Sequence, residues 1–402
     1  MKILFVITAL FLIFASCGSK NNNEENKKET NKEKNNNSLN KPVVVAYVAG
    51  WKKTDISTIQ AEKLTHINYA FANIIEGKVC FGSETDTIDN AILNENDLIE
   101  LQKLKEKNPE LKILVSVGGW TWSSNFSDAA FDENSRQKFA ASAADFVQKY
   151  NLDGIDLDWE YPNQIGAGNT YRPDDIENFT LLLKEVRKEL DKIQKPESSL
   201  WLTIASGGDS AYITNTNLSE ASKYLDFINI MGYDFYNGLH EITGHHANLF
   251  PAEHDPAVMA KKEDVRSLSL AVERHLNAGV PKEKIVVGVP FYGRKWDNLE
   301  PNGLDGLFVE SETVGIIIPY KEIIADFLEN PDFKYFFDST AMAPYLYSEK
   351  RDVFISFENP FSLKEKLKFV KQQNLRGVMF WEYSKDKDSE LLNTIFENLL
   401  KK

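Results

Sequence analysis

Eight short apolar segments recur along the chain from residue 43 onward, and they restrict the fold more than any other feature. Each is rich in β-branched or aromatic residues and is bounded by glycine, proline or charge, which is typical of buried strands. The segments are Val43–Val48, His66–Phe71, Lys112–Val117, Gly154–Glu160, Trp201–Ala205, Phe227–Met231, Ile285–Pro290 and Gly377–Trp381. We therefore predict eight strands.

Amphipathic stretches with helical periodicity lie between most of these strands. The clearest are Asp97–Lys107, Ser135–Tyr150, Asp174–Lys192, Lys262–Ala278, Leu363–Gln373 and Ser389–Leu400. Strands that mostly alternate with helices predict an α/β fold, a (β/α)8 TIM barrel, over residues 42–400. A doubly wound open sheet is the competing architecture, but no GxGxxG motif follows the first strand to favour it.

The connection between the seventh and eighth strands is too long for a simple loop. Residues 297–356 contain strand-like, aromatic-rich pieces at Phe333–Phe337 and Val353–Phe357. Because long segments without secondary structure are uncommon in compact domains, we predict a small α+β insertion here. It would form a wall beside the mouth of the barrel.

The N-terminus has the pattern of an export signal. Lys2 precedes the apolar run 3–14, which is followed by the small residues Ala15 and Ser16 and then by Cys17. The run is too short to predict a membrane span. Small residues before a cysteine resemble the lipobox of bacterial lipoproteins, which implies a signal peptide over 1–16 and a lipid anchor to the membrane on Cys17. The alternative is an ordinary cleaved secretory signal.

Residues 17–41 are nearly all Asn, Lys, Glu, Thr and Ser, so we predict a disordered tether. The chain has two cysteines, and pairing Cys17 with Cys80 would only tie this tether to a loop, so we expect no disulfide. The net charge of −14 argues against nucleic acid as a partner. We expect a monomer.

One strand carries three acids at alternate positions. Because strand side chains alternate between faces, Asp156, Asp158 and Glu160 point the same way, roughly 6–7 Å apart at successive steps. Like charges this close repel, so at least one acid should hold a proton near neutral pH, which suits general acid catalysis. The apolar residues Ile155, Leu157 and Trp159 fill the opposite face. A divalent metal bound by the three carboxylates is the alternative.

Other chemically useful residues fall where strands of the predicted barrel end. In such barrels the functional residues gather at the carboxyl ends of the strands. The residues at these ends are Ser116, Gly118, Gly119, Glu160, Tyr233, Asp234, Tyr292 and Trp381. Their shared position predicts one site at one rim.

Five ordered motifs resemble those of the family-18 glycoside hydrolases, the chitinases and their relatives. Residues 153–160 match the family pattern DGxDxDxE, and residues 116–119 match SxGG. The others are MxYD at 231–234, PFYGR at 290–294 and GxMxW at 377–381. Tyr47, Trp51 and Phe71 lie where the family has aromatic residues on the first two strands. The resemblance covers nearly all of residues 42–400, including the predicted insertion.

The resemblance implies hydrolysis assisted by the substrate itself. Glu160 would protonate the glycosidic oxygen, and the 2-acetamido oxygen of the sugar would attack the anomeric carbon. Asp158 would hold the amide N–H, with Asp156 beneath it sharing a proton. Tyr233 would donate a hydrogen bond to the acetamido carbonyl. Water activated by Glu160 would then complete the reaction with retention of configuration.

The same resemblance implies a set of substrate contacts. Trp381 would form the apolar floor under the distorted sugar, and Gly118 and Gly119 would keep side chains from crowding the carboxylates. The remaining expected contacts are Tyr47, Trp51, Phe71, Trp120, Tyr161, Met231, Asp234, Tyr292 and Arg294.

The sequence therefore predicts a chitinase that acts on β-1,4-linked N-acetylglucosamine polymers and needs no cofactor. One alternative is an endo-β-N-acetylglucosaminidase that uses the same chemistry on glycoprotein or cell-wall glycans. Another is a surface lipoprotein that binds chitooligosaccharides without cleaving them. Such relatives lose the acid that corresponds to Glu160, which this chain retains.

Three histidines and some tryptophans have weaker functional signals. His240, His245 and His246 follow the sixth strand with Glu241, but HExxxHH is not the zinc motif HExxH, so we expect them to stabilise the loop. We expect the following tryptophans to be packing residues: Trp159, Trp201 and Trp296.

Overall fold

The structure is a computed structural model that describes residues 41–401 apart from 83–94, 196–198, 263 and 301–304. The predicted signal peptide, Cys17 and all of the predicted tether except Lys41 lie outside the described residues. Residues 42–402 form one compact unit of the chain. No helix within the described residues is long and apolar enough to cross a membrane.

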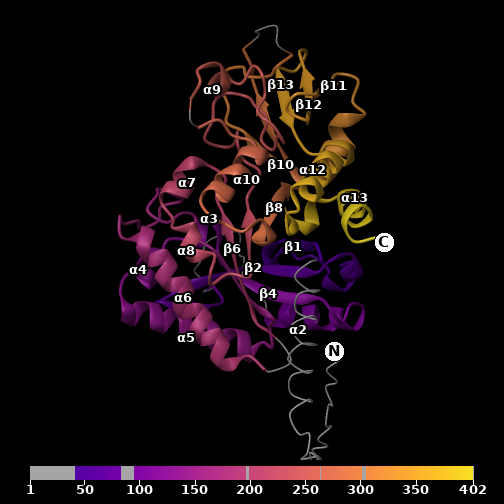
Figure 1. Cartoon of the computed structure of the whole chain (residues 1–402). Coiled ribbons are helices and arrows are strands. Elements are labelled where there is room, and N and C mark those ends of the chain that lie inside the picture. The colour runs from indigo at the N-terminus through magenta and orange to yellow at the C-terminus, as the bar shows by residue number, and fades with distance from the viewer. Residues whose placement is uncertain (1–40, 83–94, 196–198, 263, 301–304, 402) are drawn as a thin grey trace, which may run out of the picture. The chain divides into compact units, whose positions relative to one another are not determined.

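Eight parallel strands close into a barrel, which confirms the predicted TIM-barrel fold (Figure 1). Around the ring they are β1 (Val43–Ala49), β2 (His66–Ile75), β4 (Lys112–Gly118), β5 (Gly154–Asp158), β6 (Trp201–Ser206), β7 (Phe227–Ile230), β8 (Ile285–Pro290) and β14 (Gly377–Trp381). β14 pairs with β1, from Val43 with Gly377 to Ala46 with Phe380, and this pairing closes the ring. A short strand, β3 (Lys78–Cys80), pairs with the end of β2 in antiparallel orientation.

Helices surround the barrel, and α4, α5 and α6 lie side by side on one flank (Figure 1). The longer helices are α2 (Glu95–Lys103), α5 (Glu133–Lys149), α6 (Asp175–Ile193), α10 (Leu268–Asn277), α12 (Pro360–Gln373) and α13 (Glu390–Leu399). The shorter α-helices are α3 (Gly119–Trp122), α4 (Phe126–Ala130), α7 (Ser210–Thr214), α8 (Leu218–Ala221) and α9 (Pro256–Met259). Single-turn helices are η1 (Gly50–Lys52), η2 (Ile56–Thr58), η3 (Ala61–Lys63), η4 (Leu104–Glu106), η5 (Lys282–Lys284) and η7 (Tyr383–Lys385).

One predicted helix begins later than its periodicity indicates. The pattern predicts a start at Lys262, but α10 begins at Leu268. Ser267 is the N-cap, and its hydroxyl accepts a hydrogen bond from the backbone N–H of Leu270 at 3.3 Å. Because such a cap satisfies an amide that has no partner inside the helix, it fixes the start of α10.

The predicted insertion is present as a five-stranded antiparallel sheet (Figure 1). Its strand order is β10 (Ile316–Pro319), β9 (Tyr292–Asp297), β13 (Val353–Ser356), β12 (Ala343–Ser348) and β11 (Lys334–Asp338), with α11 (Tyr320–Glu322) and η6 (Ile323–Leu328) between strands. The sheet begins at Tyr292, before the expected residue 297, because the chain stays extended after β8 and Tyr292 already pairs with Pro319.

The two faces of β5 differ as the alternation predicts. Ile155, Leu157 and Trp159 are at most 2% exposed and belong to the main apolar core, so Trp159 is a core residue as predicted. The indole of Trp159 stacks on the ring of Phe126, with centroids 5.3 Å apart. Burying each such side chain stabilises the fold by about 1.5–3 kcal/mol. This packing fixes β5 and the acids on its other face.

Candidate active site

Three acids lie at the carboxyl end of β5, at the predicted rim. Asp156 is 0% exposed, Asp158 4% and Glu160 9%. β5 was predicted to reach Glu160, but it ends at Asp158. The backbone N–H of Glu160 donates to the hydroxyl of Ser123 at 2.8 Å instead of to a neighbouring strand. Ser123 in turn donates to the carbonyl of Gly119 at 2.9 Å, so it anchors the segment that carries Glu160.

Asp156 lies inside the barrel and accepts hydrogen bonds at both carboxyl oxygens. Oδ2 accepts from the hydroxyls of Tyr47 at 2.8 Å and Ser116 at 2.7 Å. Oδ1 accepts from Thr203 at 2.5 Å, and Asn229 Nδ2 lies 3.4 Å away. Burial raises the pKa of Asp156, and these donors oppose that rise.

Asp158 and Glu160 both have strongly raised pKa values. Burial, the charge of Glu160 and then that of Asp156 raise the pKa of Asp158 well above its usual value. Oδ1 of Asp158 is buried without a hydrogen-bond partner among the described residues. Burial first, and then the charge of Asp234, raise the pKa of Glu160 to about 7 despite an opposing hydrogen bond with Tyr161. Glu160 can therefore hold a proton near neutral pH and release it there.

Asp234 is a charged neighbour of this pair. Arg294 clamps it with two hydrogen bonds, from Nε to Oδ1 at 2.8 Å and from Nη2 to Oδ2 at 2.7 Å. Burial raises the pKa of Asp234, but His246, whose Nδ1 lies 3.8 Å from Oδ1, and Arg294 outweigh burial and hold it well below its usual value. Asp234 therefore stays ionised. Its clamp joins the loop after β7 to β9 of the second sheet.

Aromatic rings gather at the ends of β1, β2 and β14. The ring of Trp381 lies 5.5 Å from that of Phe71, nearly parallel to it at 18°, and 6.1 Å from that of Trp51. Trp381 and Trp51 are only partly buried. Such aromatic faces can pack against the apolar face of a sugar ring. The structure thus brings the predicted floor residue together with two other predicted contacts.

Two residues predicted to contact substrate are buried. Tyr47 and Tyr292 are each 1% exposed. The hydroxyl of Tyr47 is used by Asp156, whereas the ring of Tyr292 packs between those of Tyr233 at 6.1 Å and His246 at 5.3 Å. In this structure both support other site residues instead of lining an open surface.

Gly118 at the end of β4 and Gly119 after it leave space for neighbouring backbone and ring atoms, and not for the carboxyl groups as predicted. A Cβ atom on Gly118 would lie 2.4 Å from the backbone oxygen of Asp158. A Cβ atom on Gly119 would lie 2.5 Å from the ring of Phe71. Both residues also have positive φ, 102° and 75°, which favours glycine. They therefore permit close approach of β5 and Phe71.

The remaining predicted contacts surround these groups. Trp120 is 44% exposed, and its ring lies 6.4 Å from that of Tyr161. The hydroxyl of Tyr233 lies 3.9 Å from the sulfur of Met379. Met231 is partly buried, and its backbone N–H donates to the backbone carbonyl of Ser206 at 2.8 Å.

Sequence reasoning missed Ser123, Thr203 and Asn229, which hold Glu160 and Asp156 in place. A signal for Thr203 exists in strand register, since Asp156 pairs with Thr203 on β6 just as it pairs with Ser116 on β4. That register is not visible before the sheet is known. Ser123 has no such signal, because it follows a one-turn helix.

The three histidines of the loop after β7 have separate contacts. Nε2 of His245 lies 3.1 Å from Asp338, and the backbone carbonyl of His240 accepts a hydrogen bond from the buried indole of Trp296 at 3.0 Å. Among the residues that the structure describes, no group of three or more His, Cys, Asp or Glu side chains is arranged to hold a metal.

The chain is similar to known proteins over nearly all of its described length. The family model for Glycosyl hydrolases family 18 matches residues 43–386. Chitinase A1 of Niallia circulans is 36% identical over an alignment of 409 positions, which covers 89% of this chain and 58% of that protein. This chain therefore spans little more than half the length of that relative.

Two solved structures have the same fold. A family-18 N-acetylglucosaminidase from Paenibacillus barengoltzii is 40% identical, with a TM-score of 0.79, over 89% of this chain and 100% of that one. Chitinase ChiW from Paenibacillus sp. str. FPU-7, described as cell-surface-expressed, is 35% identical, with a TM-score of 0.80, over 89% of this chain and 33% of that one. The chain belongs to family 18 of the glycosyl hydrolases.

Proposed function

We propose that this protein is a chitinase that hydrolyses β-1,4-linked N-acetylglucosamine polymers with retention of configuration. The observation that carries the proposal is the position of the buried carboxyl of Glu160, directly after β5 and its acids Asp156 and Asp158, where burial raises its pKa to about 7. A carboxyl with this pKa can act as an acid and then as a base near neutral pH. The names of several relatives, such as Chitinase A1, support the choice of substrate.

In the first step Glu160 gives its proton to the glycosidic oxygen as the bond from that oxygen to the anomeric carbon breaks. The acetamido oxygen of the same sugar forms a bond to the anomeric carbon, giving an oxazolinium ring. The unpartnered Oδ1 of Asp158 is available to accept the amide N–H and to stabilise the positive charge. Tyr233 donates to the acetamido oxygen.

In the second step water adds to the anomeric carbon and the oxazolinium ring opens. Glu160, now a carboxylate, takes the proton of that water and returns to its starting state. Two displacements at the same carbon retain its configuration. Burial, Glu160 and Asp156 raise the pKa of Asp158. Asp158 stabilises the positive charge of the ring while the proton that it shares with Asp156 lies on Asp156.

The sugar that reacts would lie on Trp381, with Trp51 and Phe71 beside it. Asp234 would accept a hydrogen bond from a hydroxyl of this sugar. Trp120, which is exposed, would stack on a more distant sugar. No cofactor takes part.

A second candidate is an N-acetylglucosaminidase that releases single sugars. It is favoured by the Paenibacillus barengoltzii enzyme, which is 40% identical over its whole length. An endo-β-N-acetylglucosaminidase acting on glycoprotein or cell-wall glycans would use the same acids. A non-catalytic binder has no need of Glu160 or of its raised pKa.

The test is to follow the products from soluble N-acetylglucosamine oligomers by NMR, with the wild type and Glu160→Gln. We expect β-anomers to form first, disaccharides to dominate, and Glu160→Gln to lower kcat about 10²–10⁴-fold. Mainly monosaccharide would favour the second candidate. Intact oligomers alongside a cleaved glycoprotein glycan would favour the endo-acting alternative.

We also propose that the protein is exported as a monomer and anchored by a lipid on Cys17. The cell-surface expression of ChiW supports this location. The wild type should incorporate a labelled fatty acid and Cys17→Ser should not. If the wild type incorporates none, or if Cys17→Ser incorporates as much, the anchor is not on Cys17.

A further inference from the structure

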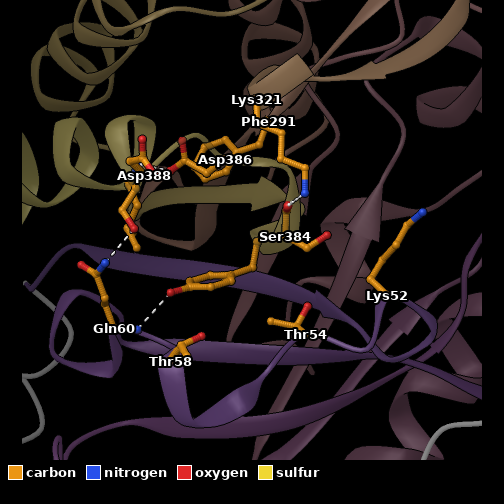
Figure 2. A pocket seen from close by; sticks show the side chains of 12 residues that line it. Lys52, Thr54, Thr58, Gln60, Phe291, Lys321, Ser384, Asp386 and Asp388 are labelled. Atoms are coloured by element: carbon orange, nitrogen blue, oxygen red, sulfur yellow. Dashed lines mark hydrogen bonds between the residues drawn. The ribbon is translucent and has the colours of Figure 1, made fainter. Parts of the chain in front are cut away.

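A pocket separate from the three acids lies against segments that also carry residues of the aromatic floor (Figure 2). It has a volume of about 550 Å³, within the range of ligand pockets. Lys52 follows Trp51 directly, and Tyr383 lies two residues after Trp381. Asp156, Asp158 and Glu160 do not line this pocket.

The walls of the pocket are held by hydrogen bonds between segments that are distant in sequence. The hydroxyl of Tyr383 accepts from the backbone N–H of Gln60 at 3.0 Å, and Nε2 of Gln60 donates to Ser389 at 2.7 Å. Lys321 donates to the backbone oxygen of Ser384 at 2.9 Å. Figure 2 shows Lys52 and Gln60 on opposite sides, with Thr54 and Thr58 between them. The pocket is therefore formed before any ligand binds.

The charges in the lining cancel. Lys52 and Lys321 are balanced by Asp386 and Asp388. Asp386 is already occupied by the backbone N–H groups at the start of α13, with Oδ1 accepting from Leu391 at 3.1 Å. A lining without net charge does not favour a strongly anionic or cationic ligand.

The pocket also offers an ammonium group. Lys52 forms no ion pair with the described residues and is exposed at the mouth. The partly buried ring of Tyr383 adds an apolar surface, and the hydroxyls and carboxylates add acceptors. This combination suits a neutral, polyhydroxylated molecule with an apolar face.

We propose that this pocket is an accessory saccharide site that binds a short N-acetylglucosamine oligomer. The proposal rests on the proposed function, because that reaction supplies such oligomers next to the pocket. The sugar hydroxyls donate to the acceptors of the lining, Lys52 donates to the ligand, and a sugar face packs on Tyr383. An oligomer held here keeps the enzyme beside the polymer between cleavage events.

The test uses Glu160→Gln, which binds oligomers without cleaving them, and counts bound N-acetylglucosamine trimer by titration calorimetry. We expect two sites per chain. Adding Thr58→Trp, which fills the mouth of the pocket, should leave one site, and Lys52→Ala should weaken the second site about fivefold or more. The matched control is Thr214→Trp, because Thr214 is also exposed and its hydroxyl also bonds to a backbone carbonyl.

One site in Glu160→Gln, or two sites that survive both Thr58→Trp and Lys52→Ala, would overturn the proposal. Melting temperatures of the variants check that each one folds. The wild type is assayed separately for hydrolysis of the same trimer. Cleavage by the wild type with a single site in Glu160→Gln would reject the pocket alone, whereas a lack of cleavage would reject the proposed function.

Discussion

At the scale of single residues, the chemistry depends on which carboxyl group holds a proton. Burial raises the pKa values of Asp156, Asp158 and Glu160, whereas Asp234 lies beside His246 and Arg294 and has a lowered pKa. Four acids within one rim therefore divide into two types. Asp234 stays charged, and Glu160 carries the proton that moves.

The first prediction concerns the pH dependence of Asp234→Asn. Activity requires protonated Glu160, so it falls on the alkaline side as Glu160 ionises with a pKa of about 7. Asp234 contributes to that raised pKa through its negative charge. Removing the charge makes ionised Glu160 less unfavourable, so its pKa falls and the alkaline limb of kcat/KM moves to lower pH.

The control for this measurement is Asp174→Asn, since Asp174 is exposed and its side chain does not cap α6. That variant should leave the alkaline limb where it is. A loss of rate in Asp234→Asn without any displacement of the limb would mean that Asp234 acts only by contact with substrate.

At the scale of elements, the ends of the strands are packed so closely that they tolerate no added atoms. Gly119→Ala should destabilise the fold by about 2–5 kcal/mol, because positive φ costs about 1–2 kcal/mol and overpacking about 1–3 kcal/mol. A Cβ atom there would lie 2.5 Å from Phe71, so activity should fall as well, since that ring must move. Urea denaturation and kcat/KM measure the two effects.

Gly168→Ala separates backbone strain from steric overlap. Gly168 has φ of +69°, close to the +75° of Gly119, but nothing lies within 4 Å of its added Cβ. It should cost only the backbone term of about 1–2 kcal/mol and leave kcat/KM unchanged. Equal losses for the two variants would show that Phe71 is not crowded.

The elements themselves were largely predictable from local pattern. All eight barrel strands were predicted, because buried parallel strands give apolar runs bounded by turn residues. The errors lie at the ends of elements, where a single hydrogen bond can determine the residue at which a helix or strand begins or ends. Examples are the bond of Ser267 at the start of α10 and that of Ser123 after the end of β5. A sequence pattern does not reveal such a bond when its partner is remote.

At the scale of the whole molecule, the buried ammonium of Lys366 forms an ion pair with a residue nearby in sequence and a hydrogen bond to a distant one. The ammonium of Lys366 on α12 contacts the carboxylate of Glu358 after β13 and the backbone carbonyl of Ala247 in the loop after β7. Both side chains are at most 2% exposed. Lys366 therefore links α12 and the segment after β13 to the loop after β7.

We predict that Lys366→Met lowers the free energy of unfolding by about 3–5 kcal/mol, because it leaves the carboxylate of Glu358 buried without its partner. Lys368→Met is the matched control on the same helix, since the exposed pair of Lys368 with Glu365 should contribute at most about 1 kcal/mol. Urea unfolding measures both. A loss below 1 kcal/mol for Lys366→Met would mean that the pair is not coupled to folding.

The sequence predicts which residues lie at the rim of the barrel, but not how deeply each of them is buried. The rule that strand ends meet at one rim predicts neighbours of the kind that the structure shows, Glu160 near Asp234 and Trp381 beside Phe71. It could not distinguish an exposed ring from a supporting one, so Tyr47 and Tyr292 were expected to contact substrate although both are buried. Burial depends on how loops from several strands cover the rim, which one segment of sequence does not encode.

The central claim is that Glu160 acts with a nucleophile supplied by the sugar. The most direct test compares release of the aryl group from an aryl N,N′-diacetyl-β-chitobioside and from the aryl β-cellobioside, which has hydroxyl groups in place of the acetamido groups. The account predicts release from the first substrate and, from the second, no release above that given by Glu160→Gln. Equal rates for the two substrates would contradict it.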